Sequence, residues 1–336
     1  MKRILLATSI LAATAGFASA EITLSGDARM GIIGGSGVDT GFTSRARVSF
    51  TMSGETDGGL TFGASFEAHN AGSTTAYELV FNDADSDNVV DPGELTLVSD
   101  SNGGASTGRS GSVYISGGFG KLTMGDIDGA AQQAVGNVGG VGLTGLGDLN
   151  EAFYLHNLVE FITGFVPNSS FDPSAAYEYS AGAFTGIISV QNPDNNLGMV
   201  SGFDTSSTYA LGMKYAMGDY TFALGYENID DFGLSHVIIG ANATFGAFTV
   251  KANYGRLSGL GSSADQWHLS GTYTADALAV TAFYSVEEDL IFLGGNDAYG
   301  IGAAYDLGGG AKVVGGYAKN STTDTDAYDL GVSFSF

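Results

Sequence analysis

The amino-acid sequence predicts an all-β fold, a transmembrane antiparallel β-barrel of about sixteen strands. Three observations favour this class. Apolar and polar side chains alternate from Glu21 to Phe336, which places them on opposite faces of each strand. Short connections alternate with long ones, as in bacterial outer-membrane barrels. The alternation also continues to the last residue, and a closed barrel leaves such a strand no free edge.

The N-terminal segment predicts a secretory signal. Two basic residues precede an apolar run over residues 4–15, and residues 18–20 have the small-x-small form of a cleavage site. The run is too short to cross a bilayer as a helix. We therefore expect residues 1–20 to be a removed signal peptide and residues 21–336 to form one barrel domain. A retained signal anchor is the alternative.

The alternation assigns strands in chain order. In the first strand, Ile22, Leu24 and Met30 share the apolar face, and Asp27 and Arg29 lie on the polar one. The same pattern marks later strands at residues 45–52, 60–69, 209–215, 220–227, 248–254, 267–273, 278–284, 299–305 and 328–336. We expect the last strand to pair with the first near Ile22 and so to close the ring.

The connections between these strands differ in length. Short ones lie at residues 53–59, 117–120, 216–219, 245–247 and 307–310. Long ones lie at residues 34–43, 71–110, 128–172, 192–205, 229–235, 256–265, 288–296 and 320–325. Aromatic residues gather near strand ends, where membrane interfaces favour them: Tyr215, Tyr220, Tyr254, Tyr284, Tyr305 and Tyr317. A soluble β-sandwich or β-helix would explain the alternation but not the loop pattern.

The composition excludes several classes of protein. Ten basic residues remain after residue 20 against 36 acidic ones, a formal charge of −26, so we expect no nucleic-acid partner. The absence of cysteine excludes disulfides and thiolate metal sites. The four histidines (His69, His156, His236 and His268) are scattered, and no catalytic or phosphate-binding motif is present. The sequence therefore predicts no enzymatic activity.

Several segments together are similar to one known family. They are LSGDARMG (24–31), SRARVSFTMSGETDGGL (44–60), GGFGKLTMGD (117–126), YSAGAF (179–184), AAYDLGGGAKVVGG (303–316) and DLGVSFSF (329–336). With these segments the chain resembles the Gram-negative general-diffusion porins of alphaproteobacterial outer membranes. The resemblance covers essentially all of the chain after residue 20.

The resemblance implies a water-filled outer-membrane channel for passive diffusion of small hydrophilic solutes and ions. It further implies a homotrimer, contacts with outer-membrane lipid and lipopolysaccharide, and a third extracellular loop folded into the pore. Phe336 matches the family's C-terminal signature for assembly into the membrane. A substrate-selective outer-membrane channel and a surface structural or adhesin barrel are the alternative functions.

Three arginines are candidates for the pore constriction. Arg29, Arg45 and Arg47 fall on the polar face of the first two strands, so they should form one patch on the inner wall. Like charges so close together cost energy unless counter-charges are near. The resemblance implies that such a cluster faces acids of the third loop. Simple solvated wall charges are the alternative reading.

The third loop supplies the candidate acids. Residues 128–172 are long enough to enter the barrel and are unusually rich in glycine. Asp148 and Glu151 lie midway along this loop, where an inserted segment would face the arginines. The loop has fewer acids than the resemblance implies.

The sequence of the second loop predicts a Ca²⁺ site. Its oxygen ligands follow EF-hand spacing, with the main-chain carbonyl of Val89 at the seventh position: Asp83, Asp85, Asp87, Val89, Asp91 and Glu94. Asn88 replaces the usual glycine, and the flanking residues are typical of strands rather than helices. An ordinary solvated acidic loop is the alternative.

Overall fold

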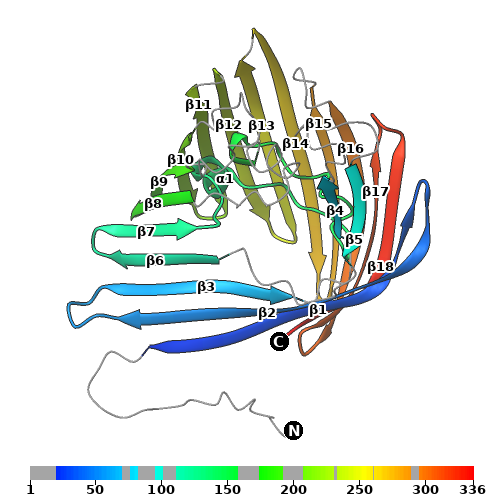
Figure 1. Cartoon of the computed structure of the whole chain (residues 1–336), viewed down its shortest axis with the longest axis horizontal. Helices are drawn as coiled ribbons and strands as arrows, with labels where there is room; N and C mark the ends of the chain where they lie inside the picture. Colours follow the sequence, from blue (N-terminus) through cyan, green and yellow to red (C-terminus); the bar gives the residue numbers. More distant parts are fainter. Residues whose placement is uncertain are drawn as a thin grey trace, which may run out of the picture.

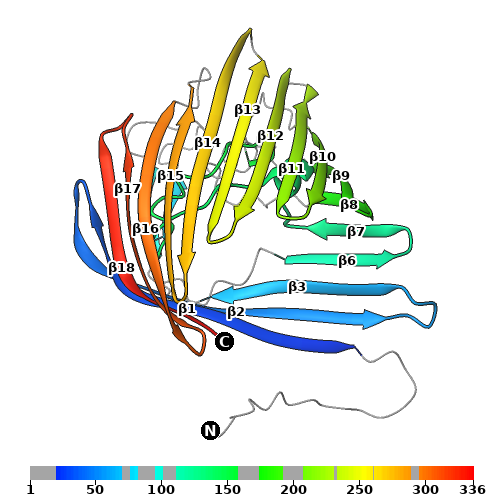
Figure 2. The same ribbon diagram turned by 180° about the vertical axis from the view of Figure 1, so that it is seen from behind.

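Sixteen strands of the chain close into a single antiparallel barrel (Figures 1 and 2). The computed structural model describes residues 20–69, 76–81, 95–100, 111–157, 174–191, 207–230, 233–259, 261–288 and 295–336. Each barrel strand pairs with its neighbours in the barrel order, and the last strand pairs with the first. The predicted fold class and strand number are therefore confirmed.

The strands have the following bounds. Those of the barrel are β1 (Glu21–Gly35), β2 (Val38–Glu55), β3 (Thr61–His69), β6 (Gly111–Gly117), β7 (Gly120–Gly125), β8 (Ser174–Ala181), β9 (Phe184–Gln191), β10 (Thr208–Met217), β11 (Tyr220–Ile229), β12 (Leu234–Phe245), β13 (Phe248–Gly259), β14 (Ser262–Ala275), β15 (Leu278–Glu287), β16 (Asn296–Gly308), β17 (Ala311–Asn320) and β18 (Thr325–Ser335). A separate two-stranded sheet contains β4 (Ala76–Phe81) and β5 (Leu95–Asp100), and one short helix is α1 (Ala130–Val135). No helix in the described parts of the chain is long and apolar enough to cross a membrane.

The ring closes where β18 meets β1. The register runs from Asp27 opposite Ser335 to Gly35 opposite Ala327. The Phe336 amide donates to the Gly26 carbonyl at 2.9 Å. The chain end therefore meets β1 at Gly26, four residues beyond the expected position near Ile22. The start of β1 pairs with β2 at these residues, so the first strand projects past the last.

The outer face of the barrel carries two bands of aromatic residues. Five strands place one aromatic residue in each band, six residues apart: Tyr209 and Tyr215, Tyr226 and Tyr220, Tyr254 and Phe248, Trp267 and Tyr273, and Tyr299 and Tyr305. Six residues of strand span about 20 Å, so the bands flank an apolar belt. Rings of neighbouring strands touch within the bands, with centroids 5.2 Å apart for Trp267 and Tyr284. This arrangement agrees with the predicted interfacial girdles.

Two connections differ from the sequence prediction. Residues 34–43 and 256–265 were expected to be long loops, yet both are tight hairpins. β1 and β2 stay paired up to Gly35 and Val38, and β13 and β14 stay paired up to Gly259 and Ser262. The prediction was wrong because these strands continue beyond the apolar belt. Residues 36–42 of the first hairpin are exposed on both faces, so the alternation disappears there although the backbone pairing continues. In the second hairpin Leu257 and Ala264 are buried against Leu155 of the third loop, a contact that the local sequence does not indicate.

Candidate pore constriction

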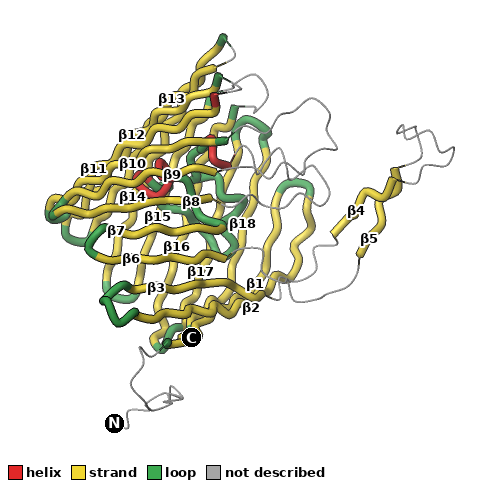
Figure 3. The backbone as a smooth tube through the Cα atoms, turned by 60° about the vertical axis from the view of Figure 1, so that its left-hand side comes forward, coloured by secondary structure: helices red, strands yellow, loops and turns green. Residues whose placement is uncertain are grey.

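One segment of the third loop lies against the inner wall of the barrel. We call residues 126–157 the inner segment; it follows β7 and contains α1. The short alanine-rich helix packs on β10 and β11, and Figure 3 shows it in red beside these strands. Ala130 and Ala131 are fully buried, and the Ala130 amide donates to Ser189 Oγ at 2.8 Å. The first turn of the segment is thus bound to the wall.

Paired glycines in the wall make room for the inner segment. Gly212 on β10 and Gly225 on β11 face each other in register, beneath α1. A Cβ atom added at Gly225 would lie 2.7 Å from Ala131 Cβ, closer than van der Waals contact permits. Gly31 and Gly331 are likewise paired across β1 and β18, beneath Leu143. Glycine is therefore required at these positions for the close approach of two backbones.

The middle of the inner segment is bound at the seam where the barrel closes. The Asp329 carboxylate on β18 accepts hydrogen bonds from the amides of Leu143 (2.9 Å) and Thr144 (2.7 Å), and from Thr144 Oγ1 (2.8 Å). Arg29 on β1 donates to the Leu143 carbonyl at 3.2 Å. Further along the wall, Ser270 Oγ accepts from the Gly139 amide at 2.8 Å. Wall side chains therefore hold this part of the segment through its main-chain groups and the Thr144 hydroxyl.

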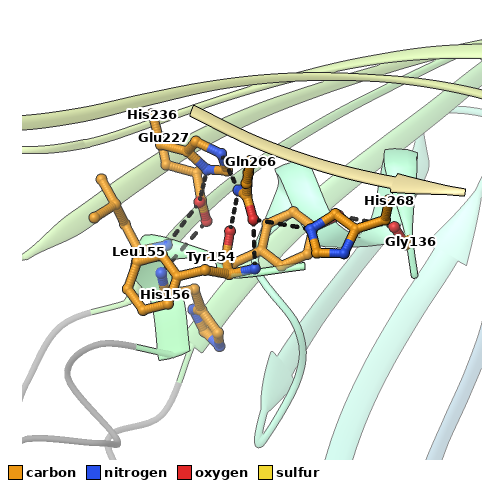
Figure 4. Close-up of polar contacts among 9 residues, drawn as sticks. Gly136, Tyr154, Leu155, His156, Glu227, His236, Gln266 and His268 are labelled. Atoms are coloured by element: carbon orange, nitrogen blue, oxygen red, sulfur yellow. Dashed lines mark hydrogen bonds and ion pairs between the residues drawn. The ribbon is translucent and has the colours of Figure 1, made fainter. Parts of the chain in front are cut away.

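A buried polar network binds the end of the inner segment (Figure 4). The side-chain amide of Gln266 forms two hydrogen bonds of 2.8 Å with the main chain of Phe153. The Glu227 carboxylate accepts from the Leu155 amide at 2.8 Å and from His236 Nδ1 at 3.0 Å. Both Glu227 and His236 are 0% exposed. A carboxylate so deeply buried is tolerated because several donors surround it.

The three predicted arginines share one patch of the wall. Arg29 and Arg45 lie opposite each other on β1 and β2, and Arg47 lies opposite Asp27. Asp27 forms ion pairs with Arg45 (3.0 Å) and Arg47 (2.7 Å), and Glu67 on β3 lies 3.4 Å from Arg47. These pairs are about one-third exposed, so solvent screens them in part. Acids of the wall itself therefore provide the nearest counter-charges.

The two predicted loop acids lie on the inner segment. A turn holds them, in which the Asp148 amide donates to the Gly145 carbonyl and the Glu151 amide donates to the Asp148 carbonyl. Among the described ion pairs, neither acid contacts an arginine. Glu151 is accessible to solvent, yet the surrounding protein partly desolvates it and raises its pKa, and nearby Asp148 raises that pKa further. Their role in the constriction stays a prediction.

The inner segment carries no basic side chain other than His156. Its four acids are Asp126, Asp128, Asp148 and Glu151. Partial desolvation also raises the pKa of Asp128, and neighbouring Asp126 adds to this shift. One side of the candidate constriction is therefore purely acidic, and the other combines arginines with wall acids.

Several residues that bind the inner segment were missed from the sequence. The alternation of the sequence places Glu227 and Asp329 on the polar faces of their strands and indicates nothing more about them. An acid on the polar face of a strand was the available signal. That signal could not reveal burial, because the burying residues are 72 positions away from Glu227 and 186 positions away from Asp329.

Two other predictions concern residues beyond this site. The candidate Ca²⁺ ligands at 83–94 lie outside the described residues, although the expected strands on either side of them are present as β4 and β5. Among the described residues, no cluster of three or more histidine or acidic side chains could hold a metal ion. Phe336 is 77% exposed and stacks on Phe334, with ring centroids 6.4 Å apart.

Comparison with known proteins gives one consistent result. The family model of the Gram-negative porins matches residues 7–325. The chain is 36% identical to a porin of Rhodobacter capsulatus over 342 residues, covering 94% of this chain and all of the relative. It is 26% identical to a porin of Fuscovulum blasticum over 328 residues, with the same coverage.

A solved porin structure, refined at 1.8 Å resolution, has the same architecture. It superposes with a TM-score of 0.70 at 34% sequence identity, and covers 94% of this chain and all of its own. The family consists of channels rather than enzymes, which agrees with the expected lack of catalysis. The chain therefore belongs to the Gram-negative porin family, whose members form diffusion channels in the bacterial outer membrane.

Proposed function

We propose that the inner segment narrows the barrel to a constriction through which small hydrophilic solutes and ions diffuse passively. The observation that carries this proposal is the binding of the segment to the inner wall by Asp329, Ser270, Gln266 and Glu227. A segment held at four places along the wall occupies a defined part of the lumen. The remaining opening is lined by charged groups, so polar solutes cross it more readily than apolar ones.

The charges of the constriction favour cations. Arg45 and Arg47 are paired with Asp27 and Glu67, and Arg29 lies beside Asp329 because both bind residue 143. The arginine side is thus close to neutral. The inner segment carries four acids and no lysine or arginine, which leaves a net negative opening. We expect a cation preference, with a transverse field between the arginines and the segment.

Conductance in a planar bilayer tests the channel proposal. Purified full-length barrel should give ohmic current steps, and a potassium chloride gradient should give a reversal potential of the sign expected for cation preference. A barrel that inserts but does not conduct would contradict the proposal and favour the adhesin or structural alternative. Binding of one sugar that blocks the current at low concentration would favour the substrate-selective alternative. The outward position of the aromatic bands argues against that alternative, since they form no track along the lumen.

We also propose that the porin is a homotrimer in contact with outer-membrane lipid and lipopolysaccharide. The exposed apolar belt between the aromatic bands supports the lipid contact. The oligomeric state rests on membership of the family. Native mass spectrometry of detergent-extracted protein should give the mass of three chains, and current steps should come in groups of three. A single-chain mass at all detergent concentrations would contradict the trimer.

The second loop is proposed to bind Ca²⁺ through the EF-hand-like register of residues 83–94. Backbone pairing of Phe81 with Leu95 brings the two ends of this loop together, as a compact ion-binding loop requires. Removal of calcium with a chelator should lower the melting temperature of the trimer, and added calcium should restore it. The D85N/D87N variant should melt at the chelated value under both conditions. Equal melting of the wild type with and without calcium would exclude a structural ion.

A further inference from the structure

The direction of the hydrogen bonds in the buried network can be derived from Gln266. Its Oε1 lies 2.8 Å from the Phe153 amide, and its Nε2 lies 2.8 Å from the Phe153 carbonyl. A peptide N–H can only donate and a carbonyl can only accept, so these two bonds fix the orientation of the side-chain amide. Gln266 Nε2 is therefore a donor to its other neighbour as well.

That neighbour is His236, whose Nε2 lies 2.8 Å from Gln266 Nε2. Because the amide nitrogen donates, His236 Nε2 must accept, and the ring is neutral with its proton on Nδ1. Nδ1 in turn donates to Glu227 at 3.0 Å. Glu227 also accepts from the amides of Leu155 and His156, at 2.8 Å and 3.4 Å. With three donors around it, Glu227 is the ionised carboxylate.

The network therefore has one proton arrangement that satisfies every bond. His268 Nε2, 3.2 Å from Gln266 Oε1, donates to that oxygen. Donation then runs from His268 through Gln266 and His236 to Glu227, as the dashed lines in Figure 4 show. An extra proton on His236 Nε2 would face the amide hydrogens of Gln266. The Gln266 amide cannot turn to relieve this, since Phe153 fixes its orientation.

All the main-chain bonds to Phe153, Leu155 and His156 described above come from this network. A second proton on His236 would repel the Gln266 amide group, and any movement of Gln266 breaks its two bonds to Phe153. We propose that Gln266, His236 and Glu227 are a proton-sensitive latch that positions the inner segment and releases residues 153–156 on acidification. The proposal rests on the inner segment being the constriction.

The direction of the pH effect on docking follows from the protonation states of His236. In the docked state both ring nitrogens of His236 are engaged and the ring has no place for a second proton, whereas release exposes it to lumen water and lets it accept one. The released state therefore binds more protons, so docking is favoured at higher pH and weakens as the pH falls. Because release takes up one proton, the equilibrium constant between the docked and released states changes by at most tenfold per pH unit.

Other ionisable groups surround the latch. On β15, Glu287 lies 3.8 Å from His268 Nε2. On the inner segment, Asp128 acts on His156 electrostatically, and Tyr154 packs its ring edge-on to His236 with centroids 5.9 Å apart. Tyr154 donates its hydroxyl proton to the Gly136 carbonyl at 2.9 Å, and burial raises its pKa, so it stays neutral. The titration assigned to the latch must therefore be separated from those of the other histidines and of these carboxyls.

Cysteine labelling measures release directly, because the chain has no native cysteine. Ala152 lies beside the latch and is only 4% exposed, so a cysteine placed there in the A152C variant reacts only when the segment is released. D57C, in the exposed turn before β3, corrects for the effect of pH on thiol reactivity. The rate of A152C divided by that of D57C should rise about tenfold between pH 7.5 and 5.5. H236N, which can still donate and accept but cannot titrate, should keep this ratio flat, and the control H69N should retain the rise.

Each result has a defined meaning. A flat ratio in the wild-type background, or a rise that persists in H236N, would overturn the latch. Conductance of the same protein at pH 7.5 reports separately on the channel: a conducting barrel with a flat ratio refutes the latch alone, and a pH-dependent ratio without conductance refutes the channel alone. If H236N does not fold, ¹⁵N NMR of the wild type decides, since a His236 ring protonated on Nε2 at pH 7.5 contradicts the derived arrangement.

Discussion

Arg29 and Asp329, on the first and last strands, bind opposite sides of the same residue of the inner segment. Asp329 accepts from the amide of Leu143 at 2.9 Å, and Arg29 donates to its carbonyl at 3.2 Å. These strands pair only when the ring closes. The inner segment therefore spans the seam of the barrel, and its docking depends on closure of the ring.

Asn in place of Asp329 should loosen the inner segment. One carboxylate serves three donors from residues 143 and 144, and an amide would turn its own hydrogens toward some of them. We expect a loss of about 1–3 kcal/mol in docking and a noisier, larger single-channel current. The control is D39N, an exposed acid on β2. Identical current noise in D329N and D39N would show that Asp329 does not anchor the segment.

Alanine at Gly225 should displace α1. The added Cβ would lie 2.7 Å from Ala131 Cβ, so the helix or the strand must move, at a cost of about 1–3 kcal/mol. Gly271 on β14 has no atom within 4 Å of such a Cβ and provides the matched control. Urea unfolding should show a lower midpoint for G225A than for G271A. Equal midpoints would mean that the close approach of helix and wall is not needed for stability.

Removal of one positive charge from the arginine patch should strengthen the cation preference. In R47A, Asp27 loses its 2.7 Å partner and Glu67 its 3.4 Å partner, which exposes negative charge to the lumen. D27N should act in the opposite direction. Reversal potentials under a salt gradient measure both changes. The control is K312A on β17, an exposed residue in no described ion pair. If R47A and D27N shift the potential in the same direction, the patch does not set selectivity by its charge.

The cation preference should weaken in mild acid. The pKa values of Asp128 and Glu151 are raised by partial desolvation, so these groups lose their charge at a higher pH than ordinary carboxyls do. The preference should therefore decline as the pH falls toward these raised values, before free carboxyls titrate near pH 4. The D128N/E151Q variant should have a weaker preference that is flat over this range. A decline unchanged in that variant would assign the effect to other groups.

Phe336 should govern assembly more than conduction. Its side chain is 77% exposed on the outer face, opposite to the face that carries the lumen charges, and its main chain already bonds to Gly26. F336A retains the main-chain bonds and removes the ring, so the amount of folded barrel in the membrane should fall several-fold. The single-channel conductance of the remaining barrels should equal that of the wild type. Reduced conductance per channel would instead give Phe336 a role in pore shape.

The sequence predicted strand faces well because a period of two reflects contact with lipid on one side and water on the other. Trp267 and His268 illustrate this, since one lies 42% exposed on the belt and the other 1% exposed on the inner wall. The hairpin ends of β1–β2 and β13–β14 were not predicted, because exposed residues 36–42 have no such contrast and Leu257 and Ala264 are buried by a distant segment. Alternation thus reports solvent contact rather than hydrogen bonding between strands.

The candidate site was predictable only in part. Arg29, Arg45 and Arg47 were placed on one patch because their spacing fixes their face and their strands are neighbours. The partners of these arginines and the anchors of the inner segment depend on how a glycine-rich loop folds back. No local pattern encodes that path, since it is set by contacts between residues far apart in the sequence, such as Leu155 with Glu227 and Gly139 with Ser270.

The ring contact between Trp267 and Tyr284 has a practical consequence. Trp267 is the single tryptophan of the sequence, and it lies on the lipid-facing band with its centroid 5.2 Å from that of Tyr284. The protein therefore contains one indole fluorophore, at one fixed depth, alongside its tyrosines. The tryptophan emission spectrum reports the polarity around the Trp267 indole, so insertion into vesicles can be followed in real time without any dye.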